Sequence, residues 1–251
     1  MRCVVAFTLL AWLGLPLVDR YGVLSLFGVH AAIMAGLAIM LSMALRTVQV
    51  PKRQPVPGLT NLPKMHLQIY RSPWMMAPAA GWLFYTSCFV AILTVIPPHI
   101  NETMRAFVLG AMPLASITVS MTLGVYLLRI LPAVRLVQIG FLLCTGGGIW
   151  LLLVPGSPAA CIALAGAMGL VQGSSFAMVP QLNETAANRA LSSGAIAQAG
   201  NLGNTIGTPL MVSSLAMAGY VGMLGTVAAL FFAGFVVHSL LAMRRRSLDV
   251  R

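Results

Sequence analysis

The stretch "GAIAQAGNLGNTIGTPLM", residues 194–211, contains five polar side chains and four glycines but no charge. In a water-soluble protein, so many amides and glycines would indicate a loop. Here the stretch lies inside a long apolar run, and that setting predicts a helix within a membrane. The polar side chains of such a helix need partners that lipid cannot supply. We therefore expect this face of the helix to meet protein or water.

The composition of the whole chain supports a membrane setting. Of its 251 residues, 59% are hydrophobic and 8% are charged, whereas about a quarter are charged in soluble domains. The net charge of +11 could suggest a nucleic-acid partner, but the basic residues fall between apolar runs rather than on one patch, so we expect none. The four cysteines lie in apolar runs without metal-ligand spacing and indicate no disulfide framework: Cys3, Cys88, Cys144 and Cys161.

We predict an all-α integral membrane protein with eight spanning helices. Each candidate is an apolar run near the length of about 20 residues that a bilayer requires. The first run is short and follows Arg2 closely, so a cleaved signal peptide is the alternative for it, although "LGLPLVDRYG" lacks a convincing small-residue cleavage site. The eight runs are residues 3–18, 22–45, 74–97, 106–128, 133–155, 158–180, 191–217 and 220–243.

The basic residues predict the orientation of these spans. With both termini cytoplasmic, 13 of the 15 Lys and Arg residues fall on the cytoplasmic side, and only Arg20 and Arg105 fall outside. Cytoplasmic loops of membrane proteins carry this excess of positive charge. We therefore expect a multi-pass protein of the plasma (bacterial inner) membrane, with the sequence "NET" at Asn101 in an outward-facing loop.

A long polar connection divides the chain unevenly. It carries four prolines, which disfavour a continuous helix. We expect residues 1–45 to be a two-helix remnant of an N-terminal half and 46–72 to be a cytoplasmic linker. A six-helix C-terminal bundle then covers 73–246, and 247–251 is a cytoplasmic tail.

At 100° per residue, the polar side chains of the opening stretch share one helical face. The glycines Gly200, Gly203 and Gly207 share a neighbouring face, and such small faces let helices approach closely in lipid. Two interpretations of the polar face are open: hydrogen bonds that hold the bundle together, or the wall of a solute cavity. We favour the cavity because five polar groups on one arc exceed what packing usually requires. They are Gln198, Asn201, Asn204, Thr205 and Thr208.

Two other spans add residues to this candidate cavity. Residues 166–183 carry Gln172, Ser175 and Phe176 on one side. The span 74–97 offers aromatic residues near its middle, for which core packing and ligand contact are both open. The residues that we expect to line the cavity are Tyr85, Gln172, Gln198, Asn201, Asn204 and Thr205.

The chain resembles the major facilitator superfamily of secondary transporters. Residues 169–211, "GLVQGSSFAMVPQLNETAANRALSSGAIAQAGNLGNTIGTPLM", look like the tenth and eleventh helices of that family. "GVYLLRILPAVRLVQIG" (124–140) is similar to its G-x-L-x-D-R-x-G-R-R turn, with Leu128 in place of the acid and Leu131 in place of the second glycine. "DRYGVLSLF" (19–27) resembles the turn that enters the sixth helix.

The resemblance implies a part of a twelve-helix transporter, from about the fifth helix to the twelfth. A substrate path then lies between this bundle and a missing N-terminal half, and it works by alternating access on a small organic solute. A missing half or a second copy of the chain is the implied protein partner, beside the lipid bilayer. The alternative is a truncated, non-transporting membrane fragment or an assembly subunit.

The chain gives no sign of an enzyme. A membrane enzyme would need a nucleophile with its base, a metal cluster or paired carboxylates, and the four histidines share no ligand spacing, so we expect no catalytic residue, metal or cofactor. No carboxylate lies in any expected span. We interpret His30 as packed or hydrogen-bonded and His238 as lying near the inner headgroups. An uncharged or amphiphilic solute fits the polar face best, although an anion held by an arginine of the absent helices stays open.

Overall fold

The computed structural model describes residues 15–45 and 62–249, and the regular structure in these two ranges is helical. Six of the described helices are long and apolar enough to cross a membrane. This is the architecture of a multi-pass membrane protein, as the composition predicts. The six are α3 (Val23–Leu45), α5 (Pro73–Val95), the run Glu102–Leu127, α8 (Ala133–Leu153), α9 (Pro158–Leu182) and α10 (Ala186–Asp249).

The N-terminal part contributes one long helix to the described residues. The expected span 3–18 lies mostly outside them, and its last residues begin the short helix α2 (Leu15–Tyr21). Gly22 then takes φ 78°, and its carbonyl accepts hydrogen bonds from Ser25 at the start of α3. The total of eight spans therefore stays a prediction.

The helices α5 and α9 begin with the same local device. Ser72 accepts a hydrogen bond from Met75 N at 3.3 Å, and Pro73 follows it. Ser157 accepts one from Ala160 N at 3.4 Å, and Pro158 follows it. A serine cap satisfies a free N–H of the first turn, and proline fits there because its missing N–H would have had no helical partner.

The fourth expected span, 106–128, is assembled from three helical pieces. Asn101 caps α6 (Glu102–Val119), accepting a hydrogen bond from Thr103 N at 3.0 Å. A π-helical turn, η4 (Ser120–Gly124), and the short α7 (Val125–Leu127) complete the run. A short 3-10 helix, η3 (Pro97–His99), precedes it. The cap explains why the helix starts four residues before the apolar run.

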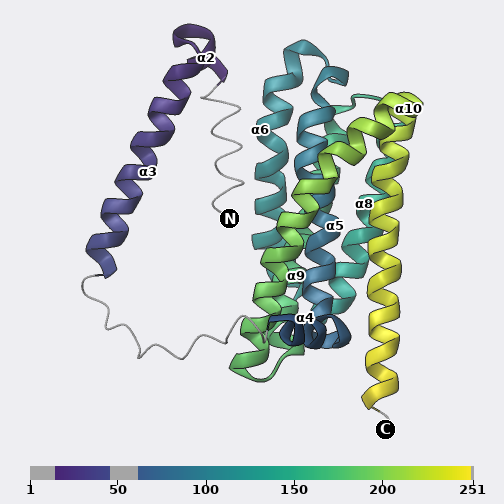
Figure 1. The fold of residues 1–251 in the computed structure, drawn as a ribbon. Helices are drawn as coiled ribbons and strands as arrows, with labels where there is room; N and C mark the ends of the chain where they lie inside the picture. Colours follow the sequence, from purple (N-terminus) through teal and green to yellow (C-terminus); the bar gives the residue numbers. More distant parts are fainter. Residues whose placement is uncertain (1–14, 46–61, 250–251) are drawn as a thin grey trace.

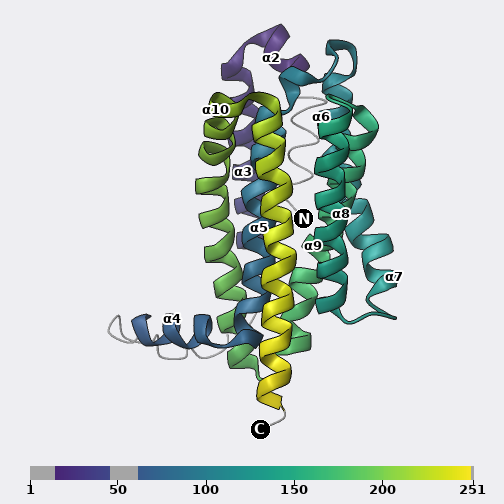
Figure 2. The same cartoon turned by 90° about the vertical axis from the view of Figure 1, so that its right-hand side faces the viewer.

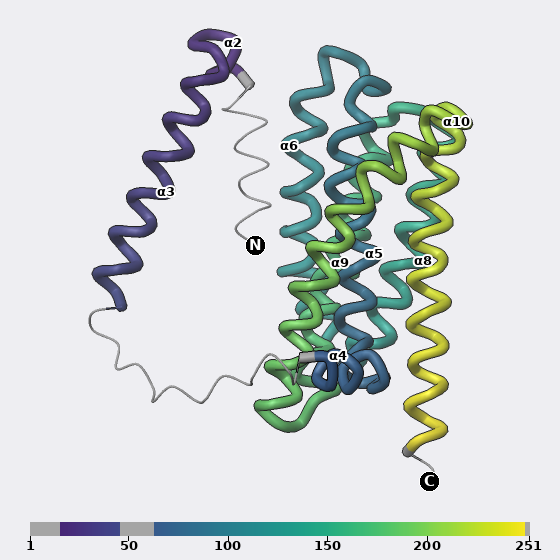
Figure 3. Tube along the Cα trace, in the orientation of Figure 1, coloured from purple at the N-terminus to yellow at the C-terminus, as the bar shows by residue number. Residues whose placement is uncertain are grey.

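The helix α10 folds back on itself. At Ala218 and Gly219 the backbone leaves helical geometry, and Gly219 has φ 62°, a conformation that glycine adopts without strain. Figures 1 and 3 show α10 running along the bundle, turning sharply and returning beside it to the C-terminal end. We call residues 186–217 the first leg and 220–249 the second leg. The turn between the two legs falls where the sequence predicts one span, 191–217, to end and the next, 220–243, to begin.

The core forms where these helices cross. α5 packs against α9 and α10, α8 packs against the same two helices, and α6 packs along α9. Glycines stand at the closest crossings: Gly169 lies against the backbone of Ser116, and a methyl group added at Gly140 would come within 3.1 Å of the Val171 nitrogen. Small residues at such contacts let helix backbones approach in a membrane.

The expected linker 46–72 contains a helix that its prolines did not suggest. α4 (Leu62–Arg71) forms its last part, with Pro63 in the first turn, where proline is tolerated. Ile69 is buried in a cluster with Met75, Ala79 and Ile196. Figure 2 shows α4 running crosswise to the bundle helices and outward to one side, near the end at which α10 finishes. We call this the α4 end; residues 46–61 lie outside the described part.

The helix α3 differs from the others in its surroundings. It contains no buried residue, and Figure 1 shows it standing away from the bundle. A helix that is apolar on all sides needs lipid or protein around it.

Candidate functional site

The first leg of α10 turns its glycines toward α5. A methyl group added at Gly207 would come within 2.8 Å of the Ser87 carbonyl carbon, and one at Gly203 within 2.7 Å of the Leu83 carbonyl oxygen. Gly200 lies against the indole of Trp82, and a methyl group added at Gly200 would come within 2.9 Å of Trp82 Cδ1. These contacts leave no room for side chains, so the two helices meet almost backbone to backbone.

Four polar side chains at the middle of the first leg lie on its exposed side. Thr205 donates its hydroxyl to the Asn201 carbonyl at 2.8 Å, within its own helix. Tyr70 of α4 donates to Gln198 Oε1 at 3.4 Å. Within the described ranges, no other helix is hydrogen-bonded to this face. We call the set the polar stripe: Gln198, Asn201, Asn204 and Thr205, all exposed.

Tyr85 and Gln172 lie inside the bundle instead of on the polar stripe. Both are buried, and the Tyr85 hydroxyl donates to Gln172 Oε1 at 3.3 Å. Ser116 of α6 donates to the same oxygen at 3.4 Å. The six residues expected to line one cavity therefore form two sets: a buried hydrogen-bonded pair and an exposed stripe.

Aromatic rings connect the two sets. Trp82 stacks on Tyr85 with a centroid separation of 4.7 Å, and it meets the edge of Phe176 at 4.8 Å. Gly200 of the first leg lies against the same Trp82 indole. Phe176 is 48% exposed. Trp82 and Phe176 thus form an apolar shelf beside the amides of the polar stripe.

Sequence reasoning did not find Tyr70 as a neighbour of the stripe. The signal was present in the linker, where Met65 and Ile69 are spaced four residues apart and basic residues occupy the opposite side. That pattern is typical of an amphipathic helix, but the four prolines of the linker favour an irregular loop. Trp82 and Phe176 stand in expected spans, and only their contacts make them part of the surface.

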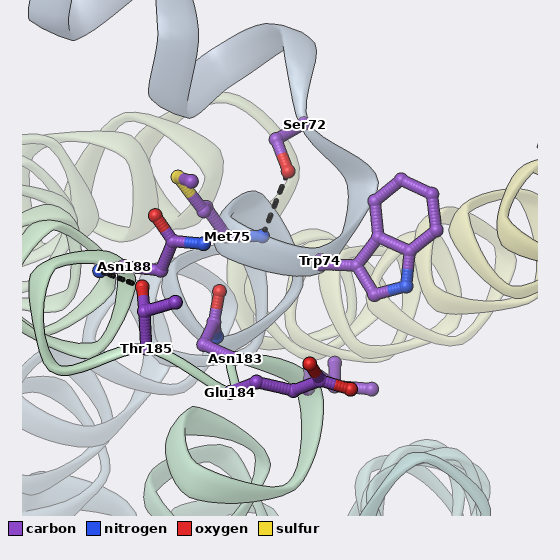
Figure 4. Close-up of a pocket in the computed structure, with 8 residues that line it drawn as sticks. Ser72, Trp74, Met75, Asn183, Glu184, Thr185 and Asn188 are labelled. Carbon is purple, nitrogen blue, oxygen red and sulfur yellow. Dashed lines mark hydrogen bonds between the residues drawn. The ribbon is translucent and has the colours of Figure 1, made fainter.

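A separate pocket opens at the α4 end, with a volume of about 260 Å³. Two helix starts meet there: Ser72 caps α5, and Thr185 accepts a hydrogen bond from Asn188 N at 3.1 Å at the start of α10. Figure 4 shows the side chain of Glu184 below that of Trp74. The lining is Ser72, Trp74, Met75, Leu182, Asn183, Glu184, Thr185 and Asn188. None of the six expected cavity residues belongs to it.

The described residues offer no cluster of three or more His, Cys, Asp or Glu side chains that could hold a metal ion. Three cysteines, Cys88, Cys144 and Cys161, are buried as free thiols.

A scan of the chain against protein-family models found no match, and a search of curated proteins found none either. The resemblance to the major facilitator superfamily therefore depends on the motifs quoted above.

Proposed function

We propose that the chain is the C-terminal part of a secondary transporter of the major facilitator type, which moves a small organic solute by alternating access. The polar stripe is the observation that carries this proposal. It is an exposed, uncharged, hydrogen-bonding surface on a helix long and apolar enough to cross a membrane.

The depth of the stripe supports a role in transport. Asn201 lies at the middle of the first leg, with about 23 Å of helix on either side at a rise of 1.5 Å per residue. Its neighbours Gly200 and Gly203 contact Trp82 and Leu83, at the middle of α5. Secondary transporters place their solute sites near the bilayer midplane, where lipid cannot satisfy an amide.

The chemistry of the surface favours an uncharged solute with one apolar side. The amides of Gln198 and Asn201 can each donate and accept hydrogen bonds, and they do so without a buried charge that would have to be desolvated. Trp82 and Phe176 offer an apolar shelf beside them. Tyr85 and Gln172, beneath that shelf, hold Trp82 in place from inside the bundle.

We also propose that the α4 end is cytoplasmic, in a plasma (bacterial inner) membrane. Basic residues gather in the segments that meet this end, including Arg189 in the first turn of α10 and Arg244–Arg246 at its other end. Positive charge of this kind marks the cytoplasmic side.

Binding of defined solutes to the purified chain in nanodiscs tests the proposal. We would use uncharged nucleosides and aryl glycosides, which combine a flat ring with hydroxyl groups, and follow thermal stabilisation. Asn201→Ala should weaken binding by roughly 1 kcal/mol, about fivefold in Kd, while the protein still folds. The matched control is Thr226→Ala, which removes a hydroxyl bonded to Ser214 on the other leg and should leave Kd unchanged.

Two results would count against transport by this surface. One is unchanged Kd with lowered stability in Asn201→Ala, which would make the stripe a packing device. The other is the absence of both binding and uptake, for the chain alone and for the chain joined to the sequence encoded upstream of it.

A second candidate function is a non-transporting membrane subunit. The exposed stripe and α3, which contains no buried residue, favour it, since both surfaces are available to a protein partner. A photo-crosslinking amino acid at position 201 separates the candidates: a subunit would form a protein adduct that excess solute does not reduce, whereas a transporter cavity would lose crosslinking when solute binds.

A further inference from the structure

His238 is buried in the bundle without a hydrogen bond. It lies on the second leg of α10 and is 0% exposed. Neither Nδ1 nor Nε2 has a hydrogen-bonding partner among the described residues. The sequence analysis expected this residue near the inner headgroups, and the structure buries it among the helices of the bundle. Most buried polar side chains in folded proteins are paired, so an unpaired one needs an explanation.

Three helices enclose the imidazole. A methyl group added at Gly81 of α5 would lie 3.1 Å from Nε2 of His238, and it would also collide with the Ser175 hydroxyl of α9. Phe141 of α8 packs against the ring with centroids 5.6 Å apart. Gly81 stands about 12 Å along α5 from Pro73, at the helical rise of 1.5 Å. The site is thus about a third of the way into the bundle from the α4 end.

The charges around this site do not favour an imidazolium. Gly81 of α5 and Phe141 of α8, which contact the ring, and Ser175 of α9, which lies beside Gly81, are uncharged. The charged group that interacts with the ring is Arg245, on the same leg, whose guanidinium donates to the Pro73 carbonyl at 2.8 Å. A second positive charge near Arg245, buried away from water, is unfavourable. In the packed bundle the ring is therefore neutral.

A neutral ring still has one N–H and one lone pair, and the packed bundle uses neither. The contact with Phe141 would be served equally by a phenyl ring. The Ser175 hydroxyl, which borders the same Gly81 surface, donates to the Val171 carbonyl at 2.7 Å within α9. Burying the polar atoms of His238 thus costs free energy in the packed state, and these atoms form no hydrogen bond there. Ionisable side chains at membrane depth generally mark a functional site.

We propose that His238 is a proton-binding site, filled when α9 and the second leg of α10 part from α5 at the α4 end. A hydronium ion from water at that end gives its proton to the free lone pair of the ring, which leaves water and an imidazolium. The imidazolium donates to water and to the Ser175 oxygen. Because protonation occurs in the parted state and not in the packed one, acid favours the parted state. The inference does not rest on the proposed function.

Thiol labelling at two depths of α9 tests this site. Met178→Cys puts a reporter about one turn from Ser175 at a buried position, and the native Cys161, buried near the other end of α9, is the internal control. Cys3, Cys88 and Cys144 would be replaced by alanine. Maleimide labelling of the chain in nanodiscs would be followed at pH 7.5 and 5.5, with each rate divided by that of the denatured chain at the same pH.

We expect the corrected labelling rate at position 178 to rise about tenfold between pH 7.5 and 5.5, the change given by a group that titrates near pH 6.5 when exposed. The rate at Cys161 should not change. His238→Phe, which keeps the ring packing, should abolish the pH response, and His238→Gln serves the same purpose if the phenylalanine variant does not fold.

Two results would overturn the proposal. The first is an equal acid response at position 178 and at Cys161 in the chain with native His238, which would mean global unfolding. The second is a response at position 178 that survives replacement of His238, or no response in the first place.

Discussion

At the scale of single residues, the lack of a side chain on glycine decides how closely α10 approaches α5. Gly207 faces the Ser87 carbonyl, whereas Gly194, thirteen residues earlier on the same leg, has nothing within 4 Å of an added methyl. The two glycines are equivalent in helix propensity but opposite in surroundings. The close contact, rather than the glycine itself, sets the cost of a substitution.

We therefore expect Gly207→Ala to destabilise the bundle by about 1–3 kcal/mol, the usual cost of overpacking a filled contact. Gly194→Ala should be neutral or stabilising by up to about 1 kcal/mol, since alanine is the better helix former. Thermal unfolding of both variants in the same detergent measures the difference. Equal stabilities would show that the α5–α10 contact is looser than the structure has it.

Residues also show where sequence reasoning reaches its limit. The periodicity of residues 198–208 predicts that amides and glycines occupy different faces, and the structure has the glycines on α5 and the amides exposed. The same periodicity cannot say that Tyr85 and Gln172 pair with each other, because that depends on the rotation of α5 and α9 about their own axes. The burial of His238 depends on three other helices and has no signal in its own.

At the scale of elements, the turn between the two legs of α10 contains two non-helical residues, Ala218 and Gly219. The apolar pattern predicts this break to within a residue, because residues 218 and 219 lie between two long apolar runs. The helix α4 shows the opposite case: its amphipathic pattern covers ten residues, too few to stand out beside four prolines. Short helices that gain their stability from a neighbour are difficult to predict from propensity.

The positive φ at Gly219 leads to a prediction about this turn. Gly219→Ala should destabilise the protein by about 1 kcal/mol, since a side chain is strained at φ 62° although space is available for it. The control is Gly225→Ala on the second leg, where space is also open and the backbone is helical. Unfolding by a denaturing detergent compares them; a larger loss in the control would contradict the turn geometry.

At the scale of the whole molecule, composition predicts the helical membrane class, and periodicity predicts the limits of most spans. The partner of the polar stripe is beyond such reasoning, because a stripe that faces water and a stripe that faces another polypeptide have the same pattern. The buried side of the bundle is determined by its own residues, whereas the exposed side depends on whatever meets it.

The distribution of basic residues leads to a prediction about orientation. In intact cells, an impermeant maleimide should label Thr103→Cys, at the start of α6, and should not label Ser247→Cys, near the end of α10, until the membrane is opened. Both positions are exposed in the structure. The measurement needs a background in which the native cysteines are replaced. Labelling of position 247 alone would reverse the proposed orientation.

The fold-back of α10 has a consequence for biogenesis. The first leg carries the amides, so it is the poorer substrate for insertion by the translocon when it emerges alone. The second leg follows after two residues and is more apolar at its centre, around Phe231 and Phe232. We expect the two legs to enter the bilayer together as a hairpin, so that a ribosome stalled at residue 217 would hold a first leg that is not yet committed to the membrane.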